Sequence, residues 1–521
     1  MEARALYAQN PFAMADETFE KLKSRLSSDE TGRMTHSDLE QLVLSDGQEL
    51  MRQLLQGHLD LRSPGLAEGP VVGADGLKRT HVRPHTRHLT TLVGEVEVER
   101  AGYGKRGGTS LHPLDAELNL PKDSYSLGVR RRAAEEAAKN SFDEVAQTLK
   151  DTTGAPVPKR QVEELAVRAA QDFDAFYIAR HLTPNATEAK KTGSVMVITT
   201  DGKGVVMRKE DLREQTRKAA EERTPKLSKR VTKGEKRNAK RMATVAAVYT
   251  VAPFIRAPED IVRDLAPVRD AGAPKRPRPQ NKRVWASVEK EPAEVIEDAF
   301  LEAIHRDPAR QKTWMAVVDG NKVQLDLLKE MAENYSVKLT IVLDLIHVLE
   351  YLWDASHVFN AEGSQASQDW VSERLLEILR GNASNVAAGI RRSATLRELD
   401  EKIRSAADNC ADYLLEYAPY LRYDEYLATG LPIASGVIEG ACRHLVKDRM
   451  DITGARWGLL RAEAVLKLRA LRSSGDFDEY WTFHQTREHK RNHQTRYDKG
   501  VVPTVKPPPR RSGTRGLRVV K

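Results

Sequence analysis

Two aspartates stand at the ends of apolar segments, where a folded chain would hold a carboxylate rigidly. The segment SVMVITTDGKGV is a continuous, β-branched apolar run that reaches Asp201, and KTWMAVVDG reaches Asp319 in the same way. Such runs predict buried central strands, and a carboxylate at the end of such a strand is fixed in position while it faces solvent, as a metal ligand must be. Taken singly, each aspartate is explained at least as well as a turn residue.

A third acid, Glu439, lies in the segment LPIASGVIEGACRHLVKDRM. Ser435 can cap a helix there, and Glu439 falls one turn after it. Three bases follow on the same predicted helix, so the segment could combine a metal ligand with phosphate contacts: Arg443, Lys447 and Arg449. The alternative is a surface glutamate on an amphipathic helix, which spacing alone does not exclude.

Neighbouring carboxylates repel one another, so such a group indicates either a metal site or a pair that shares a proton. Phosphoryl transfer favours the metal, because two hard ions about 3.5–4 Å apart activate the attacking oxygen and stabilise the leaving one. Asp201, Asp319 and Glu439 are therefore the predicted catalytic residues, and they are predicted to hold two Mg²⁺ or Mn²⁺ ions.

The elements between the acids must bring them together. Candidate strands at 242–251 and 283–290 follow the first strand, and then come a helix, the strand that reaches Asp319, a second helix and a last strand, VKLTIVLD. Three strands followed by alternating helices and strands predict an RNase H-like core, a mixed five-stranded sheet whose first and fourth strands are adjacent. Asp201 and Asp319 would then face each other.

Asp344 and His347 form a second pair of interest, three residues apart at the start of a predicted helix. They share a face of that helix and could orient the site or hold the helices that follow, most simply through an Asp–His hydrogen bond. No further Cys or His lies at ligand spacing, so no zinc site is expected. A competing assignment makes Asp344 the second catalytic acid, since LTIVLD also ends a strand.

Positive charge is concentrated in two blocks, within a formal net charge of +8. One fills residues 208–241 and the other lies in the C-terminal tail; both predict salt-sensitive contacts with DNA phosphates, although a solvated helix face or a disordered tail explains either block as well. The predicted contacts in the first block are Lys229, Arg230, Lys236, Arg237, Lys240 and Arg241.

A helix-turn-helix is predicted at about 141–172, with Ser141 capping its first helix and a break at Gly154. Lys159 and Arg160 begin its second helix, where contacts with base edges are made. A plain helical hairpin is the equally good alternative.

The whole chain is predicted to be a multidomain α+β protein in which an all-helical insertion interrupts the core. It lacks an apolar run of about 18 residues and a signal peptide, so the cytoplasm is the expected compartment and no membrane partner is expected. The predicted regions are 1–75 helical, 76–121 a small β-hairpin, 122–185 helix-turn-helix, 190–344 first part of the core, 345–434 helical insertion, 435–480 last part of the core and 481–521 a basic disordered tail.

Four motifs, TTDGKGV, VVDGN, LDLIHVLEYLW and SGVIEGACRHLVKDRMDITGARW, resemble in this order the ISKra-type group of bacterial insertion-sequence transposases. The resemblance spans roughly residues 190 to 475. It implies a DDE transposase whose metal-binding acids are Asp201, Asp319 and Glu439. The chain is more distantly similar to Mutator-like and hAT transposases, whose C/D-x-x-H motif is matched by Asp344 and His347.

The expected function is metal-dependent cleavage and strand transfer of an insertion sequence, with endonuclease chemistry on double-stranded DNA. Partners would be the terminal inverted repeats, target DNA and a second copy of the chain in a homodimer or higher oligomer on DNA, in the bacterial nucleoid. The alternatives are a metal-dependent nuclease of the same fold and a transposase-derived DNA-binding regulator. Trp457 could stack on a base or pack beneath Glu439, and core packing is the favoured role.

Overall fold

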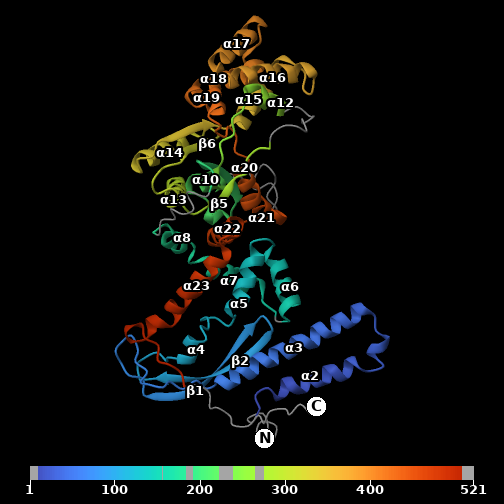
Figure 1. Cartoon of the computed structure of the whole chain (residues 1–521), viewed down its shortest axis with the longest axis vertical. Helices are drawn as coiled ribbons and strands as arrows, with labels where there is room; N and C mark the ends of the chain where they lie inside the picture. Colours follow the sequence, from blue (N-terminus) through green and yellow to red (C-terminus); the bar gives the residue numbers. More distant parts are fainter. Residues whose placement is uncertain (1–9, 155, 183–191, 222–238, 265–274, 507–521) are drawn as a thin grey trace. The chain divides into compact units, whose positions relative to one another are not determined.

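The computed structural model describes residues 10–154, 156–182, 192–221, 239–264 and 275–506 (Figure 1). Two compact units divide the chain: unit 1 comprises Met1–Asp172 with Phe477–Lys521, and unit 2 comprises Phe173–Asp476. Both contain helices and strands, so the chain has a mixed α+β fold. In the described residues, no helix is long and apolar enough to cross a membrane.

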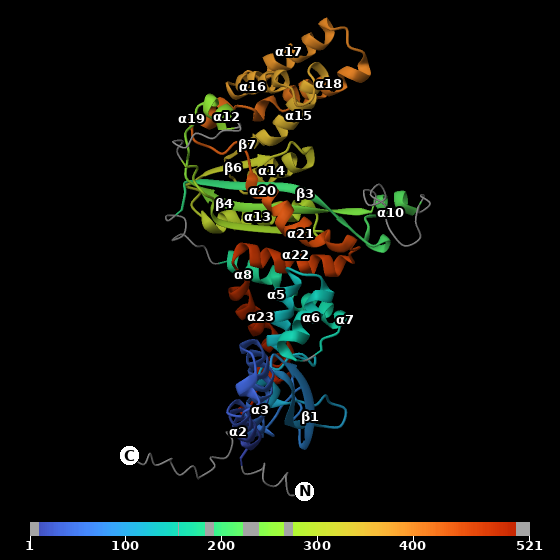
Figure 2. The same cartoon turned by 90° about the vertical axis from the view of Figure 1, so that its right-hand side faces the viewer.

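Unit 2 is built on one mixed five-stranded sheet, as predicted, with the strand order β5-β4-β3-β6-β7. The strands run over Val195–Val206 (β3), Lys240–Val251 (β4), Gln280–Ser287 (β5), Thr313–Val318 (β6) and Leu339–Leu343 (β7) (Figure 2). β3 pairs antiparallel with β4 and parallel with β6, and β7 extends the parallel part. The predicted neighbourhood of the first and fourth strands of this sheet is therefore confirmed.

Helices cover the sheet because its central strands are apolar along both faces. Every residue of β3 from Val195 to Thr200 is buried, which a strand with helices on both sides requires. α13 (Pro292–Arg306) packs on β3 and β4 and begins with a proline at its first turn, where the missing N–H is harmless. α14 (Lys322–Asn334) is capped by the Asn321 side chain and contacts β6, whereas α22 (Leu459–Ser474) packs on β5.

The segment 345–434, predicted to be helical, contains helices and no strand among its residues, all of which are described. Two of these helices, α17 and α18, pack closely against each other, and α15 packs on both α16 and α18. Their bounds are α15 Leu345–Phe359, α16 Gln365–Leu379, α17 Ala383–Leu396, α18 Glu401–Glu416, η3 Ala418–Tyr420 and α19 Tyr423–Ala428.

The remaining elements of unit 2 are short. Beyond the ends of β3 and β4, α10 (Glu214–Glu221) projects away from the sheet (Figure 2). The others are α8 Phe173–His181, η2 Lys209–Asp211, α12 Pro258–Asp264, α20 Gly436–Ala441, the π-helix η4 Cys442–Lys447, α21 Asp448–Met450 and η5 Ile452–Gly454.

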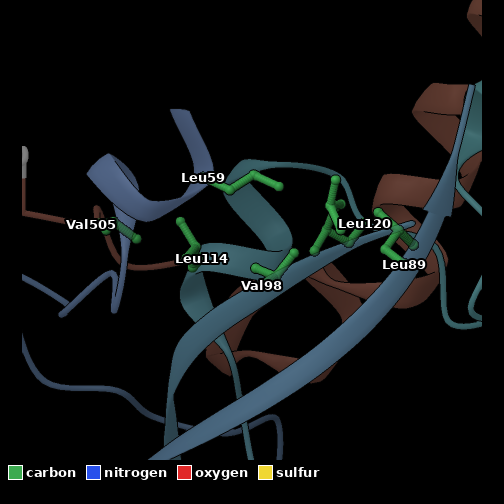
Figure 3. Packing of buried hydrophobic residues seen from close by; sticks show 7 residues of the cluster. Leu59, Leu89, Val98, Leu114, Leu120 and Val505 are labelled. Atoms are coloured by element: carbon green, nitrogen blue, oxygen red, sulfur yellow. The ribbon is translucent and has the colours of Figure 1, made fainter. Parts of the chain in front are cut away.

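Unit 1 contains the predicted hairpin, formed by β1 (His81–Thr91) and β2 (Gly94–Gly104). Seven buried residues, among them Leu59, Val98 and Val505, form a core between the long helix α3 (His36–Arg62), the hairpin and the segment after it (Figure 3). Both strands lie within the predicted hairpin region, residues 76–121, and the first part of β1, residues 81–88, is mostly exposed. The other elements are α2 Ala13–Leu26, η1 Thr31–Arg33, α4 Pro113–Glu117, α5 Leu127–Ala137, α6 Phe142–Thr153, α7 Lys159–Ala170, α23 Phe477–Asn492, η6 Gln494–Arg496 and η7 Asp498–Gly500.

Two sequence predictions about boundaries are wrong. The first core strand does not end at Asp201 but continues through Gly202 and Gly204 to Val206, because this extension pairs with β4 over its whole length. The tail is not disordered from residue 481: α23 is buried at Tyr480, Trp481 and His484, so its apolar face belongs to the core of unit 1. Residues 507–521 of the predicted tail lie outside the described part of the chain.

A buried ionic network holds β5, α13 and the end of α22 together. The guanidinium of Arg283 donates from Nε and Nη2 to both oxygens of Asp476, at 2.7 and 2.9 Å, and from Nη1 to Glu302 at 3.0 Å. Burial alone would raise the pKa of Glu302, but Arg306, His181 and Arg283 outweigh it and hold that pKa well below its usual range. The carboxylates therefore depend on these cations.

Replacing Arg283 should destabilise unit 2 strongly. We expect Arg283→Ala to lower the free energy of unfolding by about 3–5 kcal/mol, because it removes the buried cation that Asp476 and Glu302 share. The matched control is Arg263→Ala, which breaks the exposed pair with Asp260 and should change stability by about 0–1 kcal/mol. Urea unfolding measures both, and equal effects would show that the buried network carries no special weight.

Candidate functional site

The register between β3 and β6 brings Asp201 and Asp319 side by side. These parallel strands pair Val195 with Thr313 and keep the same offset as far as Thr199 and Val317. Continued by two residues, that offset places Asp201 opposite Asp319, and both side chains are half-buried. Sequence reasoning predicted this juxtaposition from the order of the strands alone.

The two acids lie on the face of the sheet that carries α20 and η4. Successive side chains of a strand point to opposite faces. The Thr200 hydroxyl donates to Gln324 Oε1 of α14 at 3.0 Å, whereas the neighbouring Asp201 accepts from Cys442 Sγ of η4 at 3.0 Å. α14 and η4 therefore cover opposite faces, and Asp201 faces η4.

The backbone that carries Asp319 is held by the helical insertion. Tyr413 of α18 donates its hydroxyl proton to the Asp319 carbonyl at 3.0 Å, and Tyr417 donates to the Gly320 carbonyl at 2.6 Å. Gly320 has φ +92°, and a Cβ there would lie 3.2 Å from both Leu343 and Tyr417. A glycine is thus required for the turn that follows Asp319. Because of these contacts, the insertion positions the second acid.

Glu439 lies in the first turn of α20, which Ser435 caps by accepting from the Ile438 amide. Its side chain is exposed, yet its pKa is raised, first by partial withdrawal of the carboxyl from water and then by the charges of Asp344, Glu350 and Asp201, against which His347 acts. Like charges act on one another in this way only at short range. The carboxyl of Glu439 therefore belongs to the same electrostatic cluster as Asp201.

Asp344 supports the site through both of its oxygens. Oδ1 accepts from the Ile346 amide at 2.9 Å and caps α15, and Oδ2 accepts from the Ser435 amide at 3.0 Å at the start of α20. Asp344 is 4% exposed, and its pKa is raised by burial, which the two amides and His347 oppose and Asp319 reinforces. A carboxylate used in this way positions α20, and with it Glu439.

The expected hydrogen bond between Asp344 and His347 is not formed. The Nδ1 atom of His347 instead lies 3.2 Å from Glu350 Oε2, one turn further along α15. The reason is that capping turns the Asp344 carboxylate toward the amides at the end of the helix, away from the side chain at His347. His347 still lies close enough to Glu439 to lower its pKa.

Cys442 is a site residue that sequence reasoning missed. It is buried, and its pKa is raised by burial and then by Asp201, so the thiol stays protonated and donates to that carboxylate. Lys203 and Asp319 also act on this thiol. The signal was its position three residues after Glu439, on the same side of a helix. The π-helical turn η4 begins at Cys442, and such turns occur frequently at functional sites.

The basic residues after Glu439 do not all face solvent. Arg443 and Lys447 are exposed. Arg449 is 2% exposed and its guanidinium lies 4.8 Å from the centre of the Trp457 ring, so its predicted phosphate contact is wrong as the chain is folded here. Trp457 is buried and donates Nε1–H to the Met450 carbonyl at 3.0 Å, which agrees with core packing. The Arg449 guanidinium therefore packs on the ring of the buried Trp457 and does not face solvent.

The residues of the 208–241 block that were predicted to contact DNA phosphates fall into three groups by their surroundings. Lys240 is exposed at the start of β4. Arg241 is half-buried and donates to the Val288 carbonyl at 2.6 Å and the Asp211 carbonyl at 3.3 Å, so it holds the sheet and is not free for a phosphate. Outside the described residues lie Lys229, Arg230, Lys236 and Arg237.

In unit 1, the predicted helix-turn-helix segment contains α6 and α7. Ser141 and Glu144 form a capping box at the start of α6, and Gly154 ends that helix with φ +66°, as the sequence indicated. Arg160 is exposed, and Lys159 forms an exposed ion pair with Asp143 at 2.6 Å. The helices agree with the prediction, and DNA recognition by them stays a prediction.

The donors at this site suit a hard divalent cation. Carboxylate oxygens are the ligands that Mg²⁺ and Mn²⁺ prefer, and the pKa of Glu439 is raised first by burial and then by nearby negative charges, whose repulsion a cation would relieve. Within the described residues, however, no three Asp, Glu, His or Cys side chains are arranged as a ready metal-holding group. The chemistry of the acids fits such an ion, whereas their present side-chain positions are not those of a closed cage.

Comparison of the chain with protein-family models finds no model that matches it, and comparison with curated proteins finds no match.

Removing the Asp344 carboxylate should loosen α20. We expect Asp344→Ala to lower the free energy of unfolding by about 2–4 kcal/mol, through the lost cap and the unpaired Ser435 amide. Asp344→Asn, which keeps one acceptor oxygen, should lose less. Hydrogen exchange at residues 435–441 should rise more than at α16 of the same unit, and unchanged exchange there would contradict a positioning role for Asp344.

Proposed function

We propose that this chain is a DDE-type DNA transposase with an RNase H-like core, acting on the ends of an insertion sequence. The observation that carries the proposal is the β3–β6 register, whose continuation by two residues beyond Thr199 and Val317 puts Asp201 opposite Asp319. The strand order β5-β4-β3-β6-β7 and a third acid within electrostatic reach of Asp201 support it.

Asp201, Asp319 and Glu439 would together hold two Mg²⁺ or Mn²⁺ ions. When bound, these ions supply Lewis-acid activation of the attacking oxygen and stabilisation of the leaving oxygen of a phosphodiester. The chain's own contribution is to hold the acids in place. Cys442 orients the Asp201 carboxylate, the tyrosines of the insertion fix the turn after Asp319, and Asp344 anchors the helix of Glu439.

The surroundings of the acids suit a DNA backbone. Lys203 follows Asp201 by two residues on β3 and so lies on the same face of the sheet. Arg443 and Lys447 are exposed one and two turns after Glu439. Cations next to the acids can pair with the phosphates on either side of the scissile bond, which the acids alone would repel.

Besides these backbone contacts in unit 2, we assign recognition of the DNA sequence to unit 1. We infer that α6 and α7 of unit 1 read the terminal inverted repeats, with Lys159 and Arg160 at the start of the second helix. Joining two transposon ends to one target requires both ends at once, so the active species on DNA would hold at least two copies of the chain.

The proposal is tested by a strand-joining assay with the full chain, Mg²⁺ or Mn²⁺, and duplexes carrying the inverted repeats that flank its coding sequence. We expect Asp201→Ala, Asp319→Ala and Glu439→Ala each to reduce joining by at least 10³-fold while binding of the repeats is retained, because the acids act in chemistry and not in recognition. Glu350→Gln, which removes a neighbouring charge on α15, is the matched control and should keep joining.

Three other outcomes would change the assignment. An active Asp319→Ala beside an inactive Asp344→Ala would make Asp344 the second acid. Cleavage without joining would identify a nuclease of the same fold. Specific binding with no metal-dependent cleavage in the unsubstituted chain would identify a DNA-binding regulator and contradict the proposal.

A further inference from the structure

Unit 1 contains a cavity of about 520 Å³ that the proposed catalytic site does not use. The hairpin β1–β2 contributes Arg87 and Arg100 to its wall, and the C-terminal end of α23 with the turn after it contributes Arg491 and Arg496. Lys122 also lines the cavity. All of these residues belong to one unit, so the cavity is complete within it.

Positive charge in the wall exceeds negative charge. Five cationic side chains line the cavity, against a single carboxylate, Asp115. Arg491 is already neutralised, because both of its terminal nitrogens contact Asp172. Four cations then remain for one acid, so the wall keeps a net charge of about +3 before a ligand enters.

The two arginines beside Asp115 are largely buried, and one of them, Arg100, is incompletely hydrogen-bonded. Arg100 contacts Asp115 Oδ2 through Nη1, and Arg87 Nη1 lies 3.8 Å from the same oxygen. Both arginine side chains are only 14% exposed, and Arg100 Nε is buried without a hydrogen-bond partner. Buried donors of this kind are normally satisfied, so the bare Nε indicates that a partner belongs there.

Burial and the nearby positive charges lower the pKa values of the two histidines in the wall. Burial lowers the pKa of His112 to about 3, and Arg100 and Arg496 are among the charges that lower it further. Burial likewise lowers the pKa of His493 to about 4, although its bond to the Leu120 carbonyl opposes the change. Both rings are therefore neutral near pH 7, and the arginines and the lysine supply the positive potential.

We propose that this cavity binds a phosphate group, either as inorganic phosphate or as a phosphodiester of a nucleic-acid backbone. A phosphate offers several oxygens in different directions, and cations converge on the cavity from the hairpin, the segment at Lys122 and the end of α23. One carboxylate would be satisfied by a single arginine. The cavity is larger than one phosphate ion needs, which leaves room for the groups attached to it.

Asp115 distinguishes the two forms of this ligand. Its Oδ1 is buried without a partner. Inorganic phosphate at neutral pH carries a proton that this oxygen can accept, whereas a phosphodiester carries none. Free phosphate would therefore use the acid, and a backbone phosphate would use the cations alone.

The test compares the full chain with Lys122→Gln/Arg496→Gln, two exposed residues of the cavity whose replacement spares its buried pair. Lys21→Gln/Arg33→Gln, which removes the same charge from exposed positions on and after α2, is the matched control. Calorimetric titration with inorganic phosphate should show at least tenfold weaker binding in the cavity variant and no change in the control. In a salt series with duplex DNA, the slope of log K against log salt should fall by about 1.8 for two lost contacts.

The outcomes separate the sources. Weaker phosphate binding with an unchanged DNA slope assigns the cavity to free phosphate, and a reduced DNA slope assigns it to the nucleic-acid backbone. If the cavity variant matches the control in both titrations, the proposal is overturned. Neither titration requires strand joining, so the result is independent of whether the acids of unit 2 are catalytic.

Discussion

The parallel pairing of β3 with β6 is the constraint on which the candidate site depends. It aligns two apolar strands from distant parts of the sequence, and the first charged residue after each aligned stretch is an aspartate. Like charges held on adjacent strands repel, so hydrogen-bond donors or cations beside such a pair stabilise it. The Cys442 thiol donates a hydrogen bond to Asp201, and the Asn321 backbone amide donates one to Asp319. A bound cation would offset the repulsion between the two carboxylates more strongly than these hydrogen bonds do.

The helical insertion is tied to this pair and is not merely appended to the sheet. Two of its tyrosines hold the turn after Asp319, and a third, Tyr423, donates to the Leu343 carbonyl at 2.8 Å at the end of β7. Asp344 then joins α15, the first helix of the insertion, to α20, the helix that follows the insertion. The Asp344 carboxylate thus bonds to the chain both where the insertion begins and where the chain returns to the core at α20. The contacts that hold the insertion in place therefore also position Glu439.

The sequence was informative where a local rule decides the structure. Strand order followed from apolar runs and helix signals, and the caps at Ser141 and Ser435 followed from side-chain chemistry. Predictions from the sequence failed where tertiary contacts decide the structure. Arg449 packs against the buried Trp457 ring, and Arg241 donates to two backbone carbonyls. Pairing with β4 extends β3 beyond Asp201. Its spacing from Glu439 was the one local signal for Cys442, and the contact with Asp201 is made only in the folded chain.

Manganese binding tests the central claim most directly, because it measures the metal at the acids without any DNA or catalysis. Mn²⁺ added to the full chain should be taken up, as electron paramagnetic resonance of the free ion reports. Asp201→Asn/Asp319→Asn should abolish this uptake, whereas Asp344→Asn should retain it, because Asp344 bonds to two backbone amides. Undiminished uptake by the double variant, or its loss in Asp344→Asn alone, would contradict the assignment of the paired aspartates as the metal ligands.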